Sequence, residues 1–352
     1  VITGCAMHIN QMNMNASRLI VNRAGLPDAV PAQTINRFCS SGLQAISTAV
    51  NAITAGQYKV AVAGGCEYMT GCFTPYDFAT YGDKWIMDNY PGGYMSMGQT
   101  AENVANDYGF TREQMDEMAL ESHTRAAQAR KNGKLAPSII PYTKEDGTVV
   151  DYDDGILAEL DGTLKTSMEK MAGLKTCFVA AEDGGKVTAA TSSQTTDAAS
   201  YVMIMDSDFA AEHGIKPIAK MIAFQVAGCD ATRMGMGPVY AIPEALKQAG
   251  MTSVKDLDVI ELNEAFASQA MACVKNVVKN PMLDGFQEMW DTKKVNPYGG
   301  AMALGHPMGA TGAFLTCKVL DYLRDPETAG KHGMVTMCIG GGMGAAGIYE
   351  LL

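Results

Sequence analysis

Three residues that lie far apart in the chain combine reactive side chains with polar or glycine-rich surroundings: Cys39, His306 and Cys338. A cysteine thiolate is a strong nucleophile, and an imidazole exchanges protons near neutral pH. A second thiol can donate or accept a proton when it is held near a thiolate or an imidazole. The three side chains predict nucleophilic catalysis with proton transfer, provided that the fold brings them together.

Cys39 lies in the segment Asn36–Gly42, directly before an apolar pattern with helical spacing that runs to residue 53. A helix N-terminus carries a partial positive charge and free N–H groups, so we expect it to lower the pKa of the Cys39 thiol. The small residues that follow the cysteine leave room for a substrate beside the sulfur. An inert buried cysteine is the competing interpretation.

The other candidate residues also have structural interpretations. His306 has five glycines around it between Gly299 and Gly312, which indicates a shaped backbone that carries the imidazole. Cys338 ends an apolar strand pattern, and strand packing would also explain it. Asn263 follows the predicted strand 258–262, where its amide positions water or a carbonyl oxygen, or only caps the next helix.

The predicted elements form two similar α/β halves. The first 70 residues are predicted as strand, helix, turn, helix and strand, with Cys39 in the turn. The last third repeats this order around His306 and ends with a strand that leads into Cys338. Residues 70 to 190 have the character of an insertion over a core. Ligands of such sheets bind at the carboxyl ends of strands, where these turns fall.

Composition narrows the class of protein. The 352 residues, 47% hydrophobic and 18% charged, are typical of a globular chain. Nine cysteines without a CxxC pair predict free thiols in a reducing compartment and no zinc site. The net charge of −11 argues against a nucleic-acid partner, and no apolar run is long enough to span a membrane. Gly342–Gly347 matches a dinucleotide-binding fingerprint, but the chain after it is too short for the required helix and strand.

Four segments, in this order and spacing, resemble the thiolase family: Asn36–Gly42, Asn263–Phe266, Gly299–Gly312 and Cys338–Gly344. The resemblance covers the chain from Val1 to Leu352. It implies an α/β, thiolase-like fold of two similar halves, each with a mixed five-stranded sheet and helices, plus an inserted loop domain. The implied division has an N-terminal half, the inserted loop domain and a C-terminal half, at residues 1–70 with 188–216, 71–187 and 217–352.

The resemblance also implies a division of roles. Cys39 matches the nucleophile that accepts the acyl group, His306 the base that activates it, and Cys338 the acid or base that exchanges a proton with C2 of acetyl-CoA. Asn263 matches the residue whose bound water forms one oxyanion site with His306, and the N–H groups of Cys39 and Gly340 match the other. A Claisen-type reaction needs both sites, because one carbonyl is attacked while a thioester stabilises a carbanion.

CoA and acyl-CoA thioesters are the implied substrates, with no metal and no permanently bound cofactor. Ser193 falls where the family contacts the pantetheine arm, and Met97 falls on a segment that lines the acyl pocket. Lys165, Lys170 and Lys175 are candidates for CoA phosphates, although lysines this close together are more often a solvated face. The family also implies a homodimer or a homotetramer.

Departures from the family pattern bear on the type of thiolase. Thr191 stands where asparagine is usual, and Ser96 where acetoacetyl-specific biosynthetic members usually carry histidine. Ser96, together with Tyr240–Pro243, favours the degradative type that cleaves longer 3-ketoacyl-CoA. Thiolases normally have about 50 more residues at the front, including a central strand that completes the first sheet, so we expect a fragment of a longer protein. We expect a cytoplasmic location, with organellar targeting left open by the missing segment.

Three other functions stay open at this point. An acetyl-CoA acetyltransferase that forms acetoacetyl-CoA would use the same residues. A ketoacyl synthase of the same fold would resemble a Cys-His-His arrangement, but here Cys338 takes the third position and His332 lies at the wrong end of its strand. A non-catalytic lipid-binding protein could keep the fold, and the intact reactive residues argue against it.

Overall fold

Two four-stranded sheets form the frame of the molecule. The computed structural model describes residues 1–72, 80, 82–90 and 92–352. The sheets have the strand orders β2-β1-β3-β6 and β7-β10-β9-β8. Their strands are β1 (Ile2–Gly4), β2 (Gln33–Ile35), β3 (Val60–Tyr68) and β6 (Asp197–Met205), then β7 (Ala219–Gly228), β8 (Val259–Leu262), β9 (His332–Ile339) and β10 (Met343–Leu351). The predicted α/β fold with two similar halves is confirmed.

Both sheets are mixed. β1 pairs in parallel with β2 and β3, and β3 pairs antiparallel with β6. β8 pairs in parallel with β9, and β10 pairs antiparallel with β9 and β7. We predicted five strands in each sheet, but each sheet has four in the part of the chain that is described. In the second sheet, the chain beside β8 forms only a single bridge, between Val295 and Ile260. β1 and β3 pair directly, so the first sheet has no gap where we expected a missing central strand.

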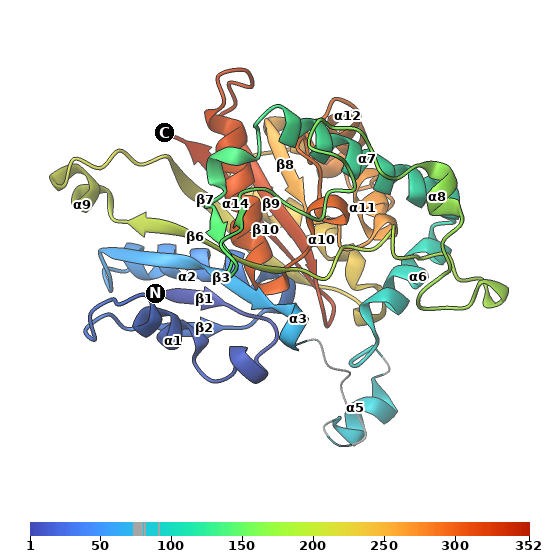
Figure 1. Cartoon of the computed structure of the whole chain (residues 1–352), viewed down its shortest axis with the longest axis horizontal. Coiled ribbons are helices and arrows are strands. Elements are labelled where there is room, and N and C mark those ends of the chain that lie inside the picture. The colour runs from blue at the N-terminus through green and yellow to red at the C-terminus, as the bar shows by residue number, and fades with distance from the viewer. Residues whose placement is uncertain (73–79, 81, 91) are drawn as a thin grey trace.

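Two helices, α2 (Ser41–Thr54) and α14 (Met308–Arg324), form a layer between the sheets (Figure 1). α2 packs on β1 and β3, and α14 packs on β3, β6 and β9. The two helix backbones approach closely at glycines: a Cβ on Gly42 would lie 2.7 Å from the Gly309 oxygen, and a Cβ on Gly312 would lie 2.2 Å from the Leu43 nitrogen. Gly309 and Gly312, two of the glycines around His306, therefore serve the contact between the two halves.

Other helices cover the outer faces of the sheets. α10 (Gly237–Gln248) packs on β7, β9 and β10, and with α11 (Ala267–Val274) it contributes to a large buried apolar cluster. The remaining described α-helices are α1 (Ala16–Arg23), α3 (Met69–Cys72), α5 (Lys84–Asn89), α6 (Met97–Asp107), α7 (Arg112–Lys131), α8 (Met168–Ala172), α9 (Ser207–Glu212), α12 (Phe286–Asp291) and α13 (Ala301–Leu304).

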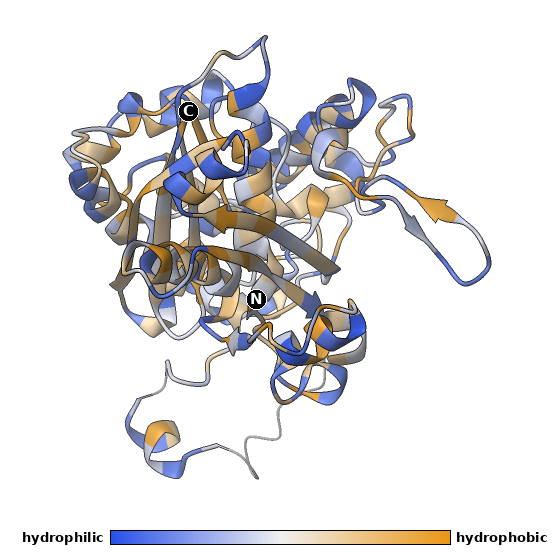
Figure 2. Cartoon of the chain, turned by 90° about the vertical axis from the view of Figure 1, so that its left-hand side faces the viewer, coloured by the Kyte–Doolittle hydropathy of each residue, from blue (hydrophilic) through white to orange (hydrophobic). Residues whose placement is uncertain are grey.

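The predicted inserted region contains α5, α6, α7, α8 and one small hairpin. The hairpin joins β4 (Tyr142–Thr143) to β5 (Val149–Val150) and projects from the body of the molecule (Figure 2). α7 begins after a capping box in which Thr111 and Gln114 satisfy each other's backbone N–H groups. Residues 73–79, 81 and 91 of this region lie outside the described residues.

Three expectations from composition can be compared with the structure. All nine cysteines are free thiols. Within the described ranges, no group of three or more histidine, cysteine or acidic side chains could hold a metal ion. No described helix has the length and apolar character that crossing a membrane requires.

Candidate active site

Cys39 lies in a tight 3-10 turn that precedes α2, rather than in the helix itself. The Asn36 side chain accepts the N–H of Phe38 at 2.8 Å, and the Ser41 hydroxyl accepts the N–H of Arg37 at 2.9 Å. Phe38 adopts a φ of +43°, in the left-handed region, which turns the chain sharply. The turn directs Cys39 into the interior, where only 6% of the residue is exposed.

Burial raises the pKa of the Cys39 thiol to about 11, so the expected lowering is wrong. The backbone N–H groups of Gly340 and of Cys39 itself act in the opposite direction, because they stabilise a thiolate. Removal from water costs the charged sulfur more than these two donors contribute. Cys39 is therefore a neutral thiol at pH 7 and needs a base to become a nucleophile.

Cys338 faces the same site from β9, which packs against the Cys39 turn. Its side chain is fully buried in an apolar cluster that includes Phe266 and Met234. Burial raises the pKa of the Cys338 thiol well above its ordinary value, and a charge on Cys39 raises it further. The structure thus brings the two predicted thiols close enough for a charge on Cys39 to oppose the ionisation of Cys338.

His306 lies between α13 and α14, with a polar partner for each ring nitrogen. Nδ1 is 2.7 Å from the Thr311 hydroxyl, and Nε2 is 3.4 Å from the side-chain nitrogen of Asn263. Burial lowers the pKa of the imidazole to about 4, so it is neutral at pH 7. With Nδ1–H donating to Thr311, Nε2 is left as a proton acceptor, which is what a base requires. The sequence analysis missed Thr311.

Asn263 is buried, with 1% of the residue exposed, and lies in the loop after β8. α11 begins only at Ala267, with Phe266 at the N-cap, so the helix-cap interpretation of Asn263 is wrong. Its side-chain oxygen has no hydrogen-bond partner among the described residues. Because an unpaired buried oxygen is costly, a water or a substrate group is needed to donate to it.

Three further predicted residues lie around the same site. Gly340 directs its N–H at the Cys39 sulfur. A Cβ on Gly340 would lie 3.4 Å from the Met97 sulfur, so Met97 borders the site as expected. The N–H of Ser193 donates to the Ala265 oxygen at 3.0 Å, which places Ser193 beside the Asn263 loop.

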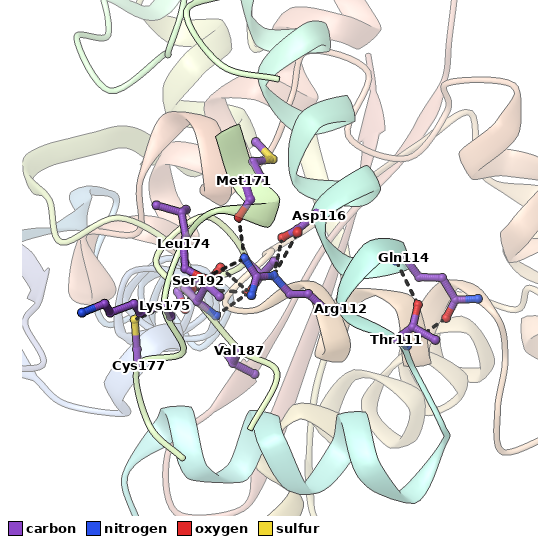
Figure 3. Close-up of polar contacts among 12 residues, drawn as sticks. Thr111, Arg112, Gln114, Asp116, Met171, Leu174, Lys175, Cys177, Val187 and Ser192 are labelled. Atoms are coloured by element: carbon purple, nitrogen blue, oxygen red, sulfur yellow. Dashed lines mark hydrogen bonds and ion pairs between the residues drawn. The ribbon is translucent and has the colours of Figure 1, made fainter. Parts of the chain in front are cut away.

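Two of the three lysines that were candidates for CoA phosphates are held by local contacts. Lys165 forms an ion pair with Glu159 at 3.2 Å, and Lys170 donates to the backbone oxygen of Lys165 at 2.7 Å. Figure 3 shows Lys175 pointing away from Arg112, which donates to two backbone oxygens at and just after α8. These contacts fit a solvated face held in shape by Arg112, and they give no sign of a phosphate site.

Glu67, at the end of β3, is a buried residue beside the site that the sequence analysis missed. Its carboxylate accepts the N–H groups of Ala6 at 2.8 Å, Met7 at 3.0 Å and Gly309 at 2.8 Å. Gly309 lies in the first turn of α14, three residues after His306. Glu67 therefore ties the first half to the turn that carries His306. A lone acid at the end of an apolar strand was the available signal.

The geometry agrees with comparisons to known proteins. Residues 1–208 match the family description "Thiolase, N-terminal domain", and residues 215–351 match "Thiolase, C-terminal domain". The chain is 40% identical to a 3-ketoacyl-CoA thiolase of Bacillus subtilis, over 100% of this chain and 87% of that protein. It is also 40% identical to an acetyl-CoA acetyltransferase of Cupriavidus necator, over 94% of this chain and 82% of that one.

A solved structure shows the same architecture. The dimeric peroxisomal thiolase of Saccharomyces cerevisiae matches with a TM-score of 0.87 and 32% identity, over 100% of this chain and 84% of the yeast chain. Two family domains in the expected order, two relatives that cover nearly the whole chain and one solved fold agree with each other. The chain therefore belongs to the thiolase family and is an acyltransferase.

Proposed function

We propose that the chain is a 3-ketoacyl-CoA thiolase, which cleaves a 3-ketoacyl-CoA with CoA to acetyl-CoA and a shortened acyl-CoA. The observation that supports this most is the grouping of Cys39, Cys338, His306 and Asn263 around one buried site. Thiolysis needs a nucleophile, a base, a second proton carrier and donors for two oxyanions. Each requirement has a side chain or backbone N–H in this group.

In the first half-reaction, His306 takes the proton of Cys39, and the sulfur attacks the 3-keto carbon. The N–H groups of Cys39 and Gly340 stabilise the oxyanion that forms. The bond between C2 and C3 then breaks, and acetyl-CoA leaves as an enolate whose oxygen faces His306 and a water held by Asn263. Cys338 protonates C2, and the proton on His306 replaces the one that Cys338 has given.

In the second half-reaction, CoA takes the acyl group from Cys39. His306, neutral again, accepts the proton of the CoA thiol, and the CoA sulfur attacks the acyl-thioester. The bond between the acyl carbon and the Cys39 sulfur breaks, and Cys39 recovers its proton from His306. Two successive transfers through a covalent intermediate predict ping-pong kinetics.

Preference for longer 3-ketoacyl chains is supported by the surroundings of α6. Ser96 caps this helix, with its hydroxyl accepting the N–H of Gln99 at 3.3 Å, so the position is occupied by a small helix-capping side chain. Met97, next along the chain, packs on the apolar cluster that contains Phe266 and Cys338. An apolar lining beside the reactive sulfurs suits a hydrocarbon chain.

Formation of acetoacetyl-CoA is the second candidate function. It is favoured by the relative named acetyl-CoA acetyltransferase, which is as similar to this chain as the relative named 3-ketoacyl-CoA thiolase. Turnover measured from acetoacetyl-CoA to long-chain 3-ketoacyl-CoA separates the two. The proposed function predicts a kcat/KM that rises with chain length, whereas a maximum at acetoacetyl-CoA would favour the second candidate.

The direct test is a CoA-dependent cleavage assay on a 3-ketoacyl-CoA, combined with mass spectrometry of the protein. Wild type is expected to turn over and to carry an acyl group on Cys39. Cys39→Ala is expected to lose at least about 10,000-fold in kcat and to carry none. Cys177→Ala, which changes an exposed cysteine, serves as the control. A wild-type protein that cleaves no 3-ketoacyl-CoA would contradict the proposal.

We also propose that the protein is a homodimer or a homotetramer that works in the cytoplasm. The dimeric yeast relative supports self-association. Nine free cysteines support a reducing compartment. The division into two halves and an inserted domain at residues 70, 188 and 217 stays a prediction.

A further inference from the structure

The short helix α13 ends directly before His306, and its last carbonyl groups lack their usual donors. In a continued α-helix, the oxygen of Met302 would accept the N–H of His306, and the oxygen of Ala303 would accept from residue 307. Pro307 has no N–H to give. The N–H of His306 donates instead to the backbone oxygen of Gln194, at 3.2 Å. Two buried carbonyl groups therefore need another donor.

The Gln194 side chain supplies that donor. Its amide nitrogen lies 3.0 Å from the Met302 oxygen, 3.4 Å from the Ala303 oxygen and 2.8 Å from the oxygen of Gly155. Gln194 thus contacts the turn in two ways. Its backbone carbonyl accepts the N–H of His306, and its side-chain amide donates to the carbonyl groups at the end of α13. Gly155 lies in the predicted inserted region, so the same amide connects that region to the turn.

Close packing leaves this turn little freedom. Gly305 has a φ of +86°, and a Cβ there would lie 2.0 Å from the Thr196 hydroxyl. A Cβ on Gly155 would lie 2.4 Å from the side-chain oxygen of Gln194. The segment before Gln194 is paired with the Asn263 loop through the bond from Ser193 to Ala265. One short segment therefore spans the distance between the Asn263 loop and the His306 turn.

We propose that Gln194 is a positioning residue, whose side-chain amide fixes the end of α13 so that the His306 imidazole stays aimed at Asn263 and the substrate. The inference rests on the proposed role of His306 as the base. Gln194 acts through the backbone: its amide contacts three carbonyl oxygens and none of the reactive side chains. A 1 Å displacement of a catalytic group costs about 100-fold in rate, so small movements of this turn matter.

The variant that isolates the amide is Gln194→Met, which keeps the length of the side chain, loses its donors and leaves the backbone carbonyl in place. We expect kcat to fall by about 10- to 100-fold, with KM for CoA within about threefold of wild type. The matched control is Gln225→Met, because Gln225 donates to Gln248 on the surface at 3.0 Å. The control is expected to keep the wild-type kcat.

A second measurement reports on His306 without any turnover. NMR of ring-labelled histidine follows the titration of the five histidines, and His306→Asn assigns the signal. Loosening the turn admits water, so in Gln194→Met we expect the pKa of His306 to rise by about one unit toward 6.5. The titratable groups on the elements packed around the turn include Cys39, Cys338, Glu67 and Glu264, together with His123 and Arg125 of α7 and Lys318 of α14, and none of them changes in this variant.

The outcomes separate this inference from the proposed function. A Gln194→Met protein with a lower melting temperature but unchanged kcat and unchanged His306 titration would overturn the positioning role. A wild-type protein without activity would refute the proposed function, and the His306 titration alone would then decide the role of Gln194.

If Gln194→Met does not fold, Gln194→Asn keeps the amide but is one methylene too short. Gln194→Asn is expected to show the same rise in the pKa of His306, and an unchanged His306 titration in that variant would equally overturn the inference.

Discussion

Strands β3 and β9 occupy the same place in their two sheets but end in different chemistry. Each pairs in parallel on one side and antiparallel on the other. β3 makes its last parallel pair through Gly65, and β9 makes its last through Thr336. Glu67 and Cys338 both lie two residues further on (67 − 65 and 338 − 336). The matched position holds a carboxylate in one half and a thiol in the other.

The surroundings of the two side chains explain the difference in use. The Glu67 oxygens accept three backbone N–H groups, one of them from Gly309 in the other half. Cys338 lies in an apolar cluster and faces Cys39. A buried carboxylate with filled hydrogen bonds is fixed in place, whereas a buried thiol beside another thiol can exchange a proton. The first half thus uses this position to join the halves, and in the proposed mechanism the second half uses it for proton transfer.

Of the matched positions Glu67 and Cys338, removing the Cys338 thiol should have the larger effect on activity. Cys338→Ser should lower 3-ketoacyl-CoA cleavage by about 1,000-fold, because a hydroxyl is too weak an acid to protonate C2. Acylation of Cys39 by a simple acyl-CoA, which breaks no bond at C2, should persist. Steady-state thiolysis and mass spectrometry of the acyl-enzyme measure the two. Equal losses in both would place Cys338 outside the proton transfer.

Removing the Glu67 carboxylate, at the matched position, should lower the stability of the fold. Glu67→Ala leaves three N–H groups, two of them buried and one partly buried, without an acceptor, so we expect a loss of about 3 kcal/mol in the free energy of unfolding. Glu67→Gln keeps the shape and one acceptor and should cost less. Chemical denaturation measures both, with Glu244→Gln, a change in an exposed ion pair with Lys247, as the control. If Glu67→Ala unfolds at the wild-type denaturant concentration, Glu67 does not join the halves.

Orientation of the base gives a smaller effect. Thr311→Val keeps the volume at the first turn of α14 but removes the partner of His306 Nδ1. A lost hydrogen bond of about 1 kcal/mol corresponds to about a 5- to 10-fold lower kcat. Thr311→Ser, which keeps the hydroxyl, should recover most of the rate. Failure of the serine variant to do so would show that Thr311 acts by packing.

The sequence predicted the elements well, because they depend on local pattern, whereas the roles of the reactive residues stay a prediction. The helix predicted after Cys39 to residue 53 is α2, which ends at Thr54, and Cys39, His306 and Cys338 lie around one site. Gly299 and Gly305 shape the backbone near His306 with positive φ, as predicted, but Gly309 and Gly312 pack against α2 in the other half. Periodicity and turn signals carry no information about such a partner.

Two of the missed features, Glu67 and Gln194, depend on contacts between distant segments, whereas Thr311 contacts His306 five residues away. Glu67, Thr311 and Gln194 have ordinary local sequences, and their roles come from Gly309, His306 and the end of α13. The pKa of Cys39 was predicted in the wrong direction, because burial raises it more than the nearby backbone N–H groups lower it. Burial of a charge outweighs two nearby N–H groups, and it is known only from the complete fold.

The smallest expected effect is a rate that hardly changes with pH. This prediction concerns a second matched pair of positions, Cys39 and His306. Cys39 and His306 each precede a helix of the central layer, and burial moves their pKa values apart, to about 11 and about 4. The reactive state, a neutral thiol with a neutral imidazole, is populated between these values. For the first half-reaction, kcat/KM should therefore change less than about twofold between pH 8 and 5.5. A histidine with the ordinary pKa of 6.5 would lose about tenfold over the same range, because about one tenth of it is neutral at pH 5.5. Returning samples from pH 5.5 to 8 before assay controls for unfolding, and a tenfold decline that reverses fully would show that His306 is not held in its buried, neutral state.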